Sequence, residues 1–309
     1  MTKSAGKAAA THSSMNRMTR GDKIFETVNC IFLGIITVII LYPLIYVLSA
    51  SISDPMSVTS GKMLLWPVDL TLDNYAEVFK NNNIMTGYRN SLAIMFMGTA
   101  INIVMTLLAA YPLSRRDLWG RGVIMKLMTV TMFFGGGLIP TYLMVGKTLK
   151  LMDSWLALIL PGALSVYNMI IMRTYFQTSI PYELQEAAEI DGCSPVITLI
   201  RIMLPMSGPI IAVLCLYYGV GHWNSYFNAL LYIRTESIQP LQLYLRKVLT
   251  ANNMQSLMEM GADEAARQAM RAETIKYSVI VVSSIPMLII YPFVQRFFVK
   301  GVMIGAIKG

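Results

Sequence analysis

Long apolar runs dominate the chain, and shorter polar stretches separate them. A helix needs roughly 20 mostly apolar residues to cross the hydrocarbon core of a membrane, and six runs approach or exceed that length. No Asp or Glu lies inside any of them, and they cover residues 27–50, 90–113, 123–146, 154–172, 206–232 and 277–295. The pattern therefore predicts an all-α, polytopic membrane protein with six transmembrane helices.

Composition supports this class. Of the 309 residues, 55% are apolar and 14% are charged, whereas an ordinary soluble domain carries roughly a quarter charged residues. The 25 Lys and Arg against 17 Asp and Glu give a net charge of +8, which on so apolar a chain indicates a basic cytoplasmic side rather than nucleic-acid binding. The cysteines show no paired spacing, so neither a disulfide framework nor a metal site is expected.

Basic residues beside the runs predict the orientation, because cytoplasmic loops are enriched in Lys and Arg. Five precede the first run and three lie in the next inner loop: Lys3, Lys7, Arg17, Arg20 and Lys23, then Arg115, Arg116 and Arg121. Both termini are therefore expected in the cytoplasm, with a disordered basic tail over 1–24 and a C-terminal tail over 296–309. The extracellular segments are expected over about 51–89 and 233–276, with a surface helix over 254–274.

An acidic cytoplasmic segment over residues 175–205 lies between the fourth and fifth runs. Pro181 stands where a helix should open, and Gly192 stands where it should end. Between them, Glu183, Glu186 and Glu189 fall three residues apart, on one side of the predicted helix. A second helix is predicted from about 195 to 203. Taken alone, the segment is as compatible with a surface helix that closes a loop as with a docking element.

The spacing inside this segment resembles a known family. Glu186-Ala187-Ala188, Asp191-Gly192 and Leu204-Pro205 are similar to the EAA loop in membrane subunits of bacterial ABC importers; Cys193 stands where many relatives have Ala. The resemblance extends from about residue 24 to 309, and the C-terminal sequence 295–309 is similar to the end of the maltose-permease G-type subunit. Within the family, the chain resembles the LplC-like group for oligosaccharide and polysaccharide uptake.

The resemblance implies a MetI-like permease fold over residues 25–309, in a bacterial cell membrane, with carbohydrate as the substrate. It implies a homologous second permease, two ATPase subunits and an extracellular sugar-binding protein as partners. ATP and Mg would be bound by the ATPase subunits, so this chain is expected to hold no cofactor and to be no enzyme. It also implies ATPase coupling as the role of Glu186, Ala187, Ala188, Asp191, Gly192, Leu204 and Pro205.

The apolar runs themselves lack the residues of other transport classes. They contain no Asp, no Glu and no pair of His residues. Carriers driven by protons or sodium ions usually have such residues inside the membrane, so another chain is expected to supply the energy. Gly146-Lys147-Thr148 matches the end of a phosphate-binding loop, but Thr141 stands where that loop requires its first glycine. His12 and His222 are too far apart in the sequence for a metal site. An ABC permease for amino acids or peptides stays the alternative, ahead of a stand-alone secondary carrier or a lipid enzyme.

The fifth run holds the candidate substrate path. Tyr217, Asn224 and Asn228 fall at i, i+7 and i+11, on one side of a predicted helix, with Trp223 beside them. Aromatic faces cover the CH groups of sugars and amides satisfy hydroxyls, although Trp223 fits the outer aromatic belt of a membrane protein equally well. Asn102 and Asn168 in the second and fourth runs are expected to link helices rather than to contact substrate, and the glycines 135–137 are expected to allow either a bend or close packing.

Overall fold

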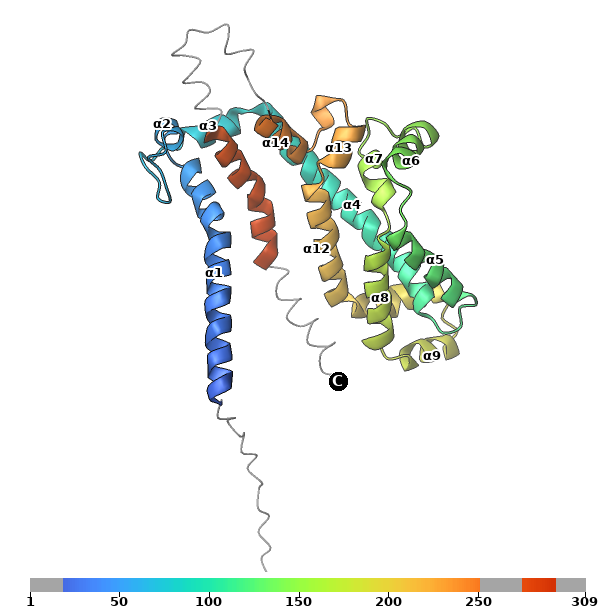
Figure 1. Ribbon diagram of the computed structural model, residues 1–309. Helices are drawn as coiled ribbons and strands as arrows, with labels where there is room; N and C mark the ends of the chain where they lie inside the picture. Colours follow the sequence, from blue (N-terminus) through green and yellow to red (C-terminus); the bar gives the residue numbers. More distant parts are fainter. Residues whose placement is uncertain (1–18, 251–273, 293–309) are drawn as a thin grey trace, which may run out of the picture.

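A computed structural model describes residues 19–250 and 274–292 (Figure 1). Helices account for most of these residues, and the described part of the chain contains no strand beyond one isolated bridge between Ser53 and Leu70. The all-α prediction is confirmed. Three predicted features lie wholly or mostly outside the described residues: the first 18 residues of the basic tail over 1–24, the C-terminal tail over 296–309, and nearly all of the surface helix over 254–274.

The first two predicted spans are continuous helices, α1 (Arg20–Ser51) and α4 (Asn82–Ser114). Each begins before the expected residue because a side chain caps it. Thr19 Oγ1 accepts the Asp22 N–H at 3.2 Å while the Asp22 carboxylate accepts the Thr19 N–H at 2.9 Å, a capping box. The prediction of disorder up to residue 24 is therefore wrong for residues 20–24, which are helical.

Two predicted spans are pairs of helical pieces that meet at a sharp bend, and another span begins at such a bend. The third bends by 107°, the fourth by 52°, and the fifth meets the segment before it at 84°. The pieces are α5 (Arg121–Phe133) with α6 (Leu138–Leu143) and η1 (Met144–Thr148), α7 (Leu156–Ile159) and η2 (Leu160–Gly162) with α8 (Val166–Thr178), and α10 (Pro195–Thr198), η3 (Leu199–Met203) and α11 (Leu204–Met206) with α12 (Gly208–Asn224). The first bend falls at the glycines 135–137, where Gly137 has φ +83°, so the expectation of a bend there is confirmed.

The predicted run 206–232 is not one helix. Its helix α12 ends at Asn224, Ser225 is extended, and a separate helix α13 (Phe227–Tyr232) follows. The last span is the helix Thr274–Pro292. The predicted extracellular segments contain further short helices: α2 (Pro55–Thr59), α3 (Asp73–Lys80), η4 (Glu236–Ile238) and α14 (Leu241–Thr250).

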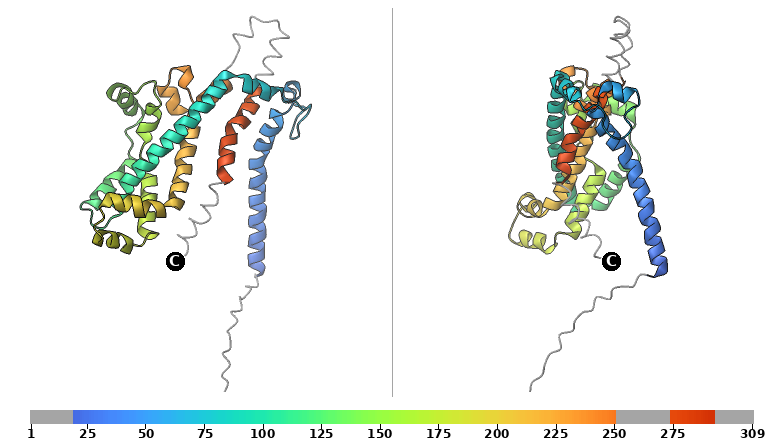
Figure 2. Two further views of the ribbon diagram at one scale, coloured as in Figure 1. Left: turned by 180° about the vertical axis from the view of Figure 1, so that it is seen from behind. Right: turned by 90° about the vertical axis from the view of Figure 1, so that its left-hand side faces the viewer.

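The helix α4 runs diagonally across the bundle and packs against both α8 and α12 (Figure 1). Their shared core is apolar, with Tyr111, Met172 and Leu214 among its buried members. In contrast, α1 leaves the bundle, and none of its most apolar stretch is buried within the chain (Figure 2). Its end near Ala50 packs against the segment that follows it and against the last helix, where Tyr46 contacts Tyr277.

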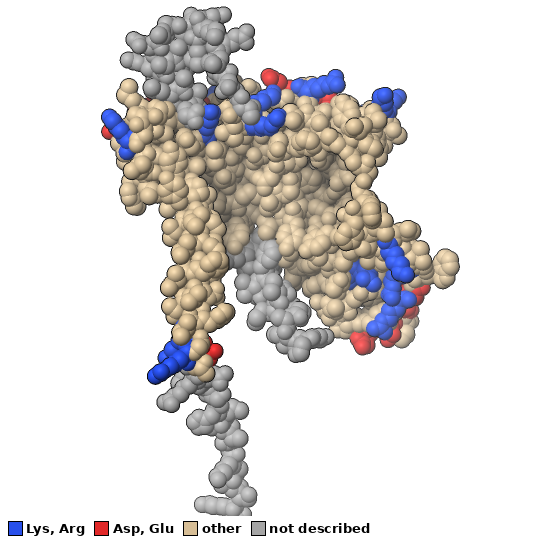
Figure 3. Space-filling view, in the orientation of Figure 1, with Lys and Arg blue, Asp and Glu red and all other residues tan. Residues whose placement is uncertain are grey.

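Charged side chains gather at two opposite ends of the molecule, and a broad band free of visible charge lies between them (Figure 3). One end carries α3 and α14; the other carries the start of α1 and the short helix α9 (Glu183–Ile190) (Figure 1). The helix Thr274–Pro292 itself runs from the α3 and α14 end toward the α9 end (Figure 1). The band has the chemistry expected of a surface that faces lipid.

Candidate functional site

The predicted acidic helix is present as α9, and local sequence fixes both of its ends. Gly192 adopts φ +73°, a left-handed conformation that favours glycine. Its N–H donates to the Glu189 carbonyl at 3.0 Å, and the Cys193 N–H donates to the Ala188 carbonyl at 2.9 Å. These two bonds form a Schellman motif, which stops α9 and reverses the chain toward α10.

The two faces of α9 differ. Gln185 and Ala188 are buried against the protein, whereas Glu186 and Ala187 are exposed. Ile190 is 86% exposed, although isoleucine is among the residues most often buried in folded proteins. Exposed Val196 and Ile200 extend this apolar surface onto the next helical segment. The arrangement presents a small apolar and acidic face at one end of the molecule, beyond the uncharged band.

Arg115, directly after α4, holds one end of α9. Its guanidinium makes two hydrogen bonds to Asp117, at 2.8 and 2.7 Å, and one to Glu189 on α9. It also donates to the Tyr111 hydroxyl at 3.2 Å. The hydrogen bonds to Asp117, followed by those to Tyr111 and Glu189, raise the pKa of Arg115. The hydrogen bonds from Arg115 in turn lower the pKa of Asp117. Sequence reasoning uses Arg115 only as a topology signal and misses this contact.

The predicted coupling residues occupy two places along one connected surface segment. Glu186, Ala187, Ala188, Asp191 and Gly192 belong to α9 and its C-terminal turn. Leu204 and Pro205 lie in α11, at the far end of the connector, where the chain bends by 84° into α12. Ser207 Oγ donates to the Met203 carbonyl at 2.5 Å across this bend.

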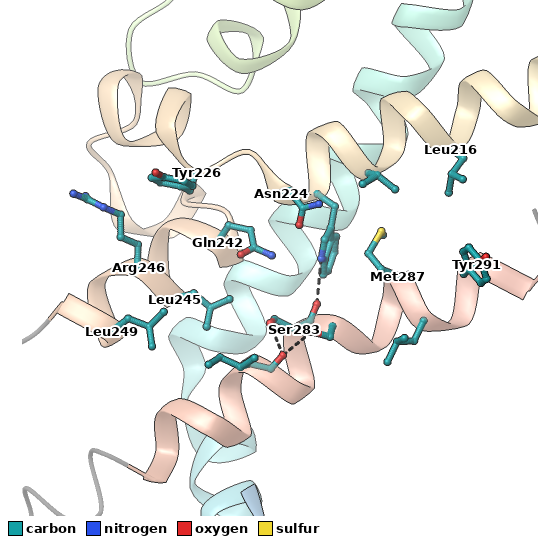
Figure 4. A pocket seen from close by; sticks show the side chains of 15 residues that line it. Leu216, Asn224, Tyr226, Gln242, Leu245, Arg246, Leu249, Ser283, Met287 and Tyr291 are labelled. Carbon is teal, nitrogen blue, oxygen red and sulfur yellow. Dashed lines mark hydrogen bonds between the residues drawn. The ribbon is translucent and has the colours of Figure 1, made fainter. Parts of the chain in front are cut away.

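A cavity of about 790 Å³ lies between α12, α14 and the helix Thr274–Pro292 (Figure 4). The side chains of Asn224 and Gln242 lie near its centre, and Tyr226 and Arg246 lie at one end. The rest of its lining is mostly apolar. Asn224 is the one residue of the predicted substrate path that lines the cavity with an exposed side chain.

The rest of the predicted path is not assembled. Tyr217 is exposed on α12 and Asn228 is exposed on α13; because α12 ends at Asn224, the expected single helix face of Tyr217, Asn224 and Asn228 does not exist. Trp223 borders the cavity but is only 1% exposed, and its Nε1 donates to the Ser283 carbonyl at 3.1 Å. Its assignment to the outer aromatic belt is therefore wrong, since the last helix covers the ring.

The two asparagines expected to link helices behave differently. Asn102 bonds to both His222 and the Gly162 carbonyl, so its expected role in linking helices is confirmed. Asn168 is buried on α8 near the start of that helix. The contact to His222 also gives that histidine a structural role that its position in the sequence does not indicate.

Comparisons with known proteins agree with this architecture. The profile of a family described as the binding-protein-dependent transport system inner membrane component matches residues 102–304. Protein LplC of Bacillus subtilis (strain 168) is 39% identical over 306 residues, which cover 97% of this chain and 100% of that protein. The polygalacturonan/rhamnogalacturonan transport system permease protein YtcP of the same organism is 41% identical over 290 residues, which cover 93% and 99% of the two chains.

A solved structure matches as well. A chain in the crystal structure of a bacterial ABC transporter involved in the import of the acidic polysaccharide alginate has a TM-score of 0.81 and 33% sequence identity, and the match covers 91% of this chain and 99% of that chain. These matches confirm the resemblance that the acidic loop indicated. The chain therefore belongs to the family of binding-protein-dependent transport system inner membrane components, the permease subunits of ABC importers, and has their MetI-like fold.

Proposed function

We propose that this chain is the membrane-spanning subunit of an ATP-driven importer for an oligosaccharide or a polysaccharide fragment. Support for a carbohydrate comes from the similar proteins, one of which is named for polygalacturonan and rhamnogalacturonan and another for alginate. The amino-acid or peptide alternative finds no such support among them. As a permease of this family, the chain is a transport subunit rather than an enzyme.

The observation that carries the proposal is the position of α9. It lies beyond the uncharged band, exposes Glu186, Ala187 and Ile190, and is tied to the bundle by Glu189 and Arg115. In our proposal this end faces the cytoplasm and both termini lie on the same side. The importer contains two ATPase subunits that bind ATP and Mg, and α9 docks in a cleft of one of them. Asp191, Gly192, Leu204 and Pro205 shape the segment, and a homologous second permease completes the membrane part.

We place the substrate path along the cavity beside α12. Its amides, Asn224 and Gln242, can bond sugar hydroxyls, and the apolar lining can cover CH groups. The second permease would close the open side of this cavity, and an extracellular sugar-binding protein would load it from the α3 and α14 end. Tyr217 and Asn228 stay predictions as further contacts on exposed parts of α12 and α13.

The test uses the complete importer in liposomes, with the charge reversal Glu186→Lys. The variant should still assemble with the ATPase subunits in part and hydrolyse ATP, but sugar uptake should fall sharply, because the introduced lysine repels the basic partner that we expect for Glu186. Glu26→Lys, a matched reversal of an exposed glutamate near the start of α1, serves as the control for added positive charge. Normal uptake by Glu186→Lys would contradict the assignment of α9.

A further inference from the structure

Two consecutive arginines hold the two ends of α9. Arg115 bonds to Glu189 in its last turn. Arg116 places its guanidinium 4.4 Å from the ring centroid of Tyr182, the residue that precedes its first turn. A helix of this length spans about 12 Å, so adjacent residues of one loop contact both ends. The two contacts thus lie at opposite ends of α9.

The loop that supplies these arginines is itself fixed to the bundle. It follows α4 directly, and the last carbonyls of α4 have side-chain partners from α8. Arg173 Nε donates to the Leu113 carbonyl at 2.8 Å, and Gln177 Nε2 donates to the Ser114 carbonyl at 3.2 Å. Both carbonyls belong to the group that a helix end leaves unsatisfied. The junction therefore joins α4 to α8 at the place where the arginines begin.

A third contact closes the loop. Arg121 at the start of α5 donates from Nη1 to the Arg115 carbonyl at 2.8 Å. The side chain of Arg115 is only 11% exposed, whereas its partners Asp117 and Glu189 are 58% and 47% exposed, so the arginine is held by the protein while the carboxylates face water. Asp117 occupies two of its donors and holds the guanidinium in a fixed plane. Contacts with Tyr111 on α4, Asp117 in the loop and Arg121 on α5 thus orient Arg115 toward Glu189.

Without the arginines, few constraints would orient α9. The Schellman bonds at Gly192 fix the local turn after α9, but they join only α9 to Gly192 and Cys193 and not to the bundle. Its buried anchors are the two inward side chains Gln185 and Ala188. A push on the exposed face of such a short helix would tilt it rather than move the spans behind it.

We propose that Arg115 and Arg116 form a clamp that makes α9 move as one body with α4 and α8, so that a displacement of α9 by the ATPase subunits becomes a displacement of the spans. Both arginines are positioning residues, which act through Glu189 and Tyr182. This inference rests on the proposed function of α9 and adds how its motion reaches the membrane part. It also assigns Glu189, rather than the exposed Glu186, to the internal contact.

The test compares sugar uptake per ATP hydrolysed by the complete importer in liposomes. Each of the single changes Arg115→Gln, Glu189→Gln and Tyr182→Leu should lower this ratio by about fivefold or more, which is the lower limit of the typical coupling between two sites. All subunits should still co-purify. Arg115→Gln with Glu189→Gln should be little worse than either single change, because both remove one contact. Arg89→Gln, an exposed arginine at the other end of α4, is the control and should leave the ratio unchanged.

A restored link provides the second readout. In a variant with Cys30, Cys193 and Cys215 changed to Ser, cysteines introduced at positions 115 and 189 are joined by a flexible bis-methanethiosulfonate reagent, which forms one disulfide with each thiol and releases one methanesulfinate at each. This link should recover the ratio, and its cleavage by a reductant should lose the recovery again. A ratio that stays normal in Arg115→Gln, or losses that simply add, would overturn the clamp. If Glu186→Lys also transports normally, the proposed function of α9 fails; if only Glu186→Lys is defective, the clamp alone fails.

Discussion

Asn102 on α4 accepts a hydrogen bond from His222 on α12, with 2.6 Å between Asn102 Oδ1 and His222 Nε2. The amide nitrogen of Asn102 donates to the Gly162 carbonyl, also at 2.6 Å. Because that nitrogen is used, the oxygen faces the imidazole and Nε2 of His222 carries the proton. One side chain thus joins the second and fifth spans to the break in the fourth, where regular helix hydrogen bonds are missing.

Replacing Asn102 with the nearly isosteric Leu should destabilise the protein by roughly 1–3 kcal/mol, because the Gly162 carbonyl and the His222 N–H lose their partner inside the membrane part. Thermal unfolding of the purified importer in detergent measures the loss. Asn228→Leu on exposed α13 is the matched control and should change the unfolding temperature little. An unchanged unfolding temperature for Asn102→Leu would show that the link is dispensable.

Gly98 makes room for this histidine. A Cβ at position 98 would lie 2.5 Å from His222 Nε2, so Gly98→Ala should displace the ring and cost about 1–3 kcal/mol. Gly221→Ala on α12 meets nothing within 4 Å and should be neutral or slightly stabilising, since Ala favours a helix over Gly. The unfolding temperatures of the two variants, measured under identical conditions, test this prediction. Equal unfolding temperatures would contradict the close contact between Gly98 and His222.

Asp153 ties the turn between the third and fourth spans to the segment after α13. Its carboxylate accepts the Arg234 and Thr235 N–H groups at 2.8 and 2.9 Å and the Thr235 hydroxyl at 2.6 Å. The Thr235 hydroxyl first, and then these backbone bonds, lower the pKa of Asp153. With a lowered pKa in the folded state, its stabilising effect is complete above the ordinary value of 3.8 and is lost as the pH falls through the folded-state pKa.

We therefore expect hydrogen exchange at Arg234 and Thr235 to be faster in Asp153→Gly than in the parent protein at neutral pH. Glycine suits this change because Asp153 has φ +59°, which Gly adopts without strain. Asp153→Asn, which keeps one acceptor, should show a smaller effect. The difference between the parent and Asp153→Gly should shrink only in strong acid; a difference that disappears already near pH ~6 would contradict the lowered pKa.

The turn at Gly192 provides a separate test of how α9 is shaped. Gly192→Val places a β-branched residue at φ +73°, which should cost about 1–2 kcal/mol locally and disrupt the Schellman bonds. Gly192→Asn is the matched control, because Asn tolerates the left-handed conformation. Uptake per ATP should fall in the Val variant and stay close to the parent in the Asn variant. Equal uptake in both would show that the reversal at Gly192 does not matter.

Elements set by local sequence can be predicted. The helix α9 occurs where it is expected because Pro181 and Gly192 bound a run of helix formers, and the long apolar runs indicate the spans. The bend in the third span follows from its glycines. The end of α12 at Asn224 cannot be predicted, because the apolar run continues past it with no Gly or Pro to mark the break; the sequence pattern therefore places Asn228 on the wrong helix.

Contacts between distant residues escape sequence reasoning as well. Arg115 and Glu189 are 74 residues apart, and nothing in either local sequence indicates that they meet. The pattern places Trp223 either at a sugar or in the aromatic belt, but the last helix covers it and accepts its N–H at Ser283. Such contacts depend on how the bent spans pack, which the periodicity of a single segment does not encode.

The most direct test of the central claim is purification of the affinity-tagged chain from its native membrane, followed by uptake of a labelled oligosaccharide in liposomes. The account predicts that a second permease and an ATPase co-purify, and that uptake requires ATP and the cognate binding protein. A chain that purifies alone and still drives uptake of a solute without ATP would contradict the account and indicate a secondary carrier.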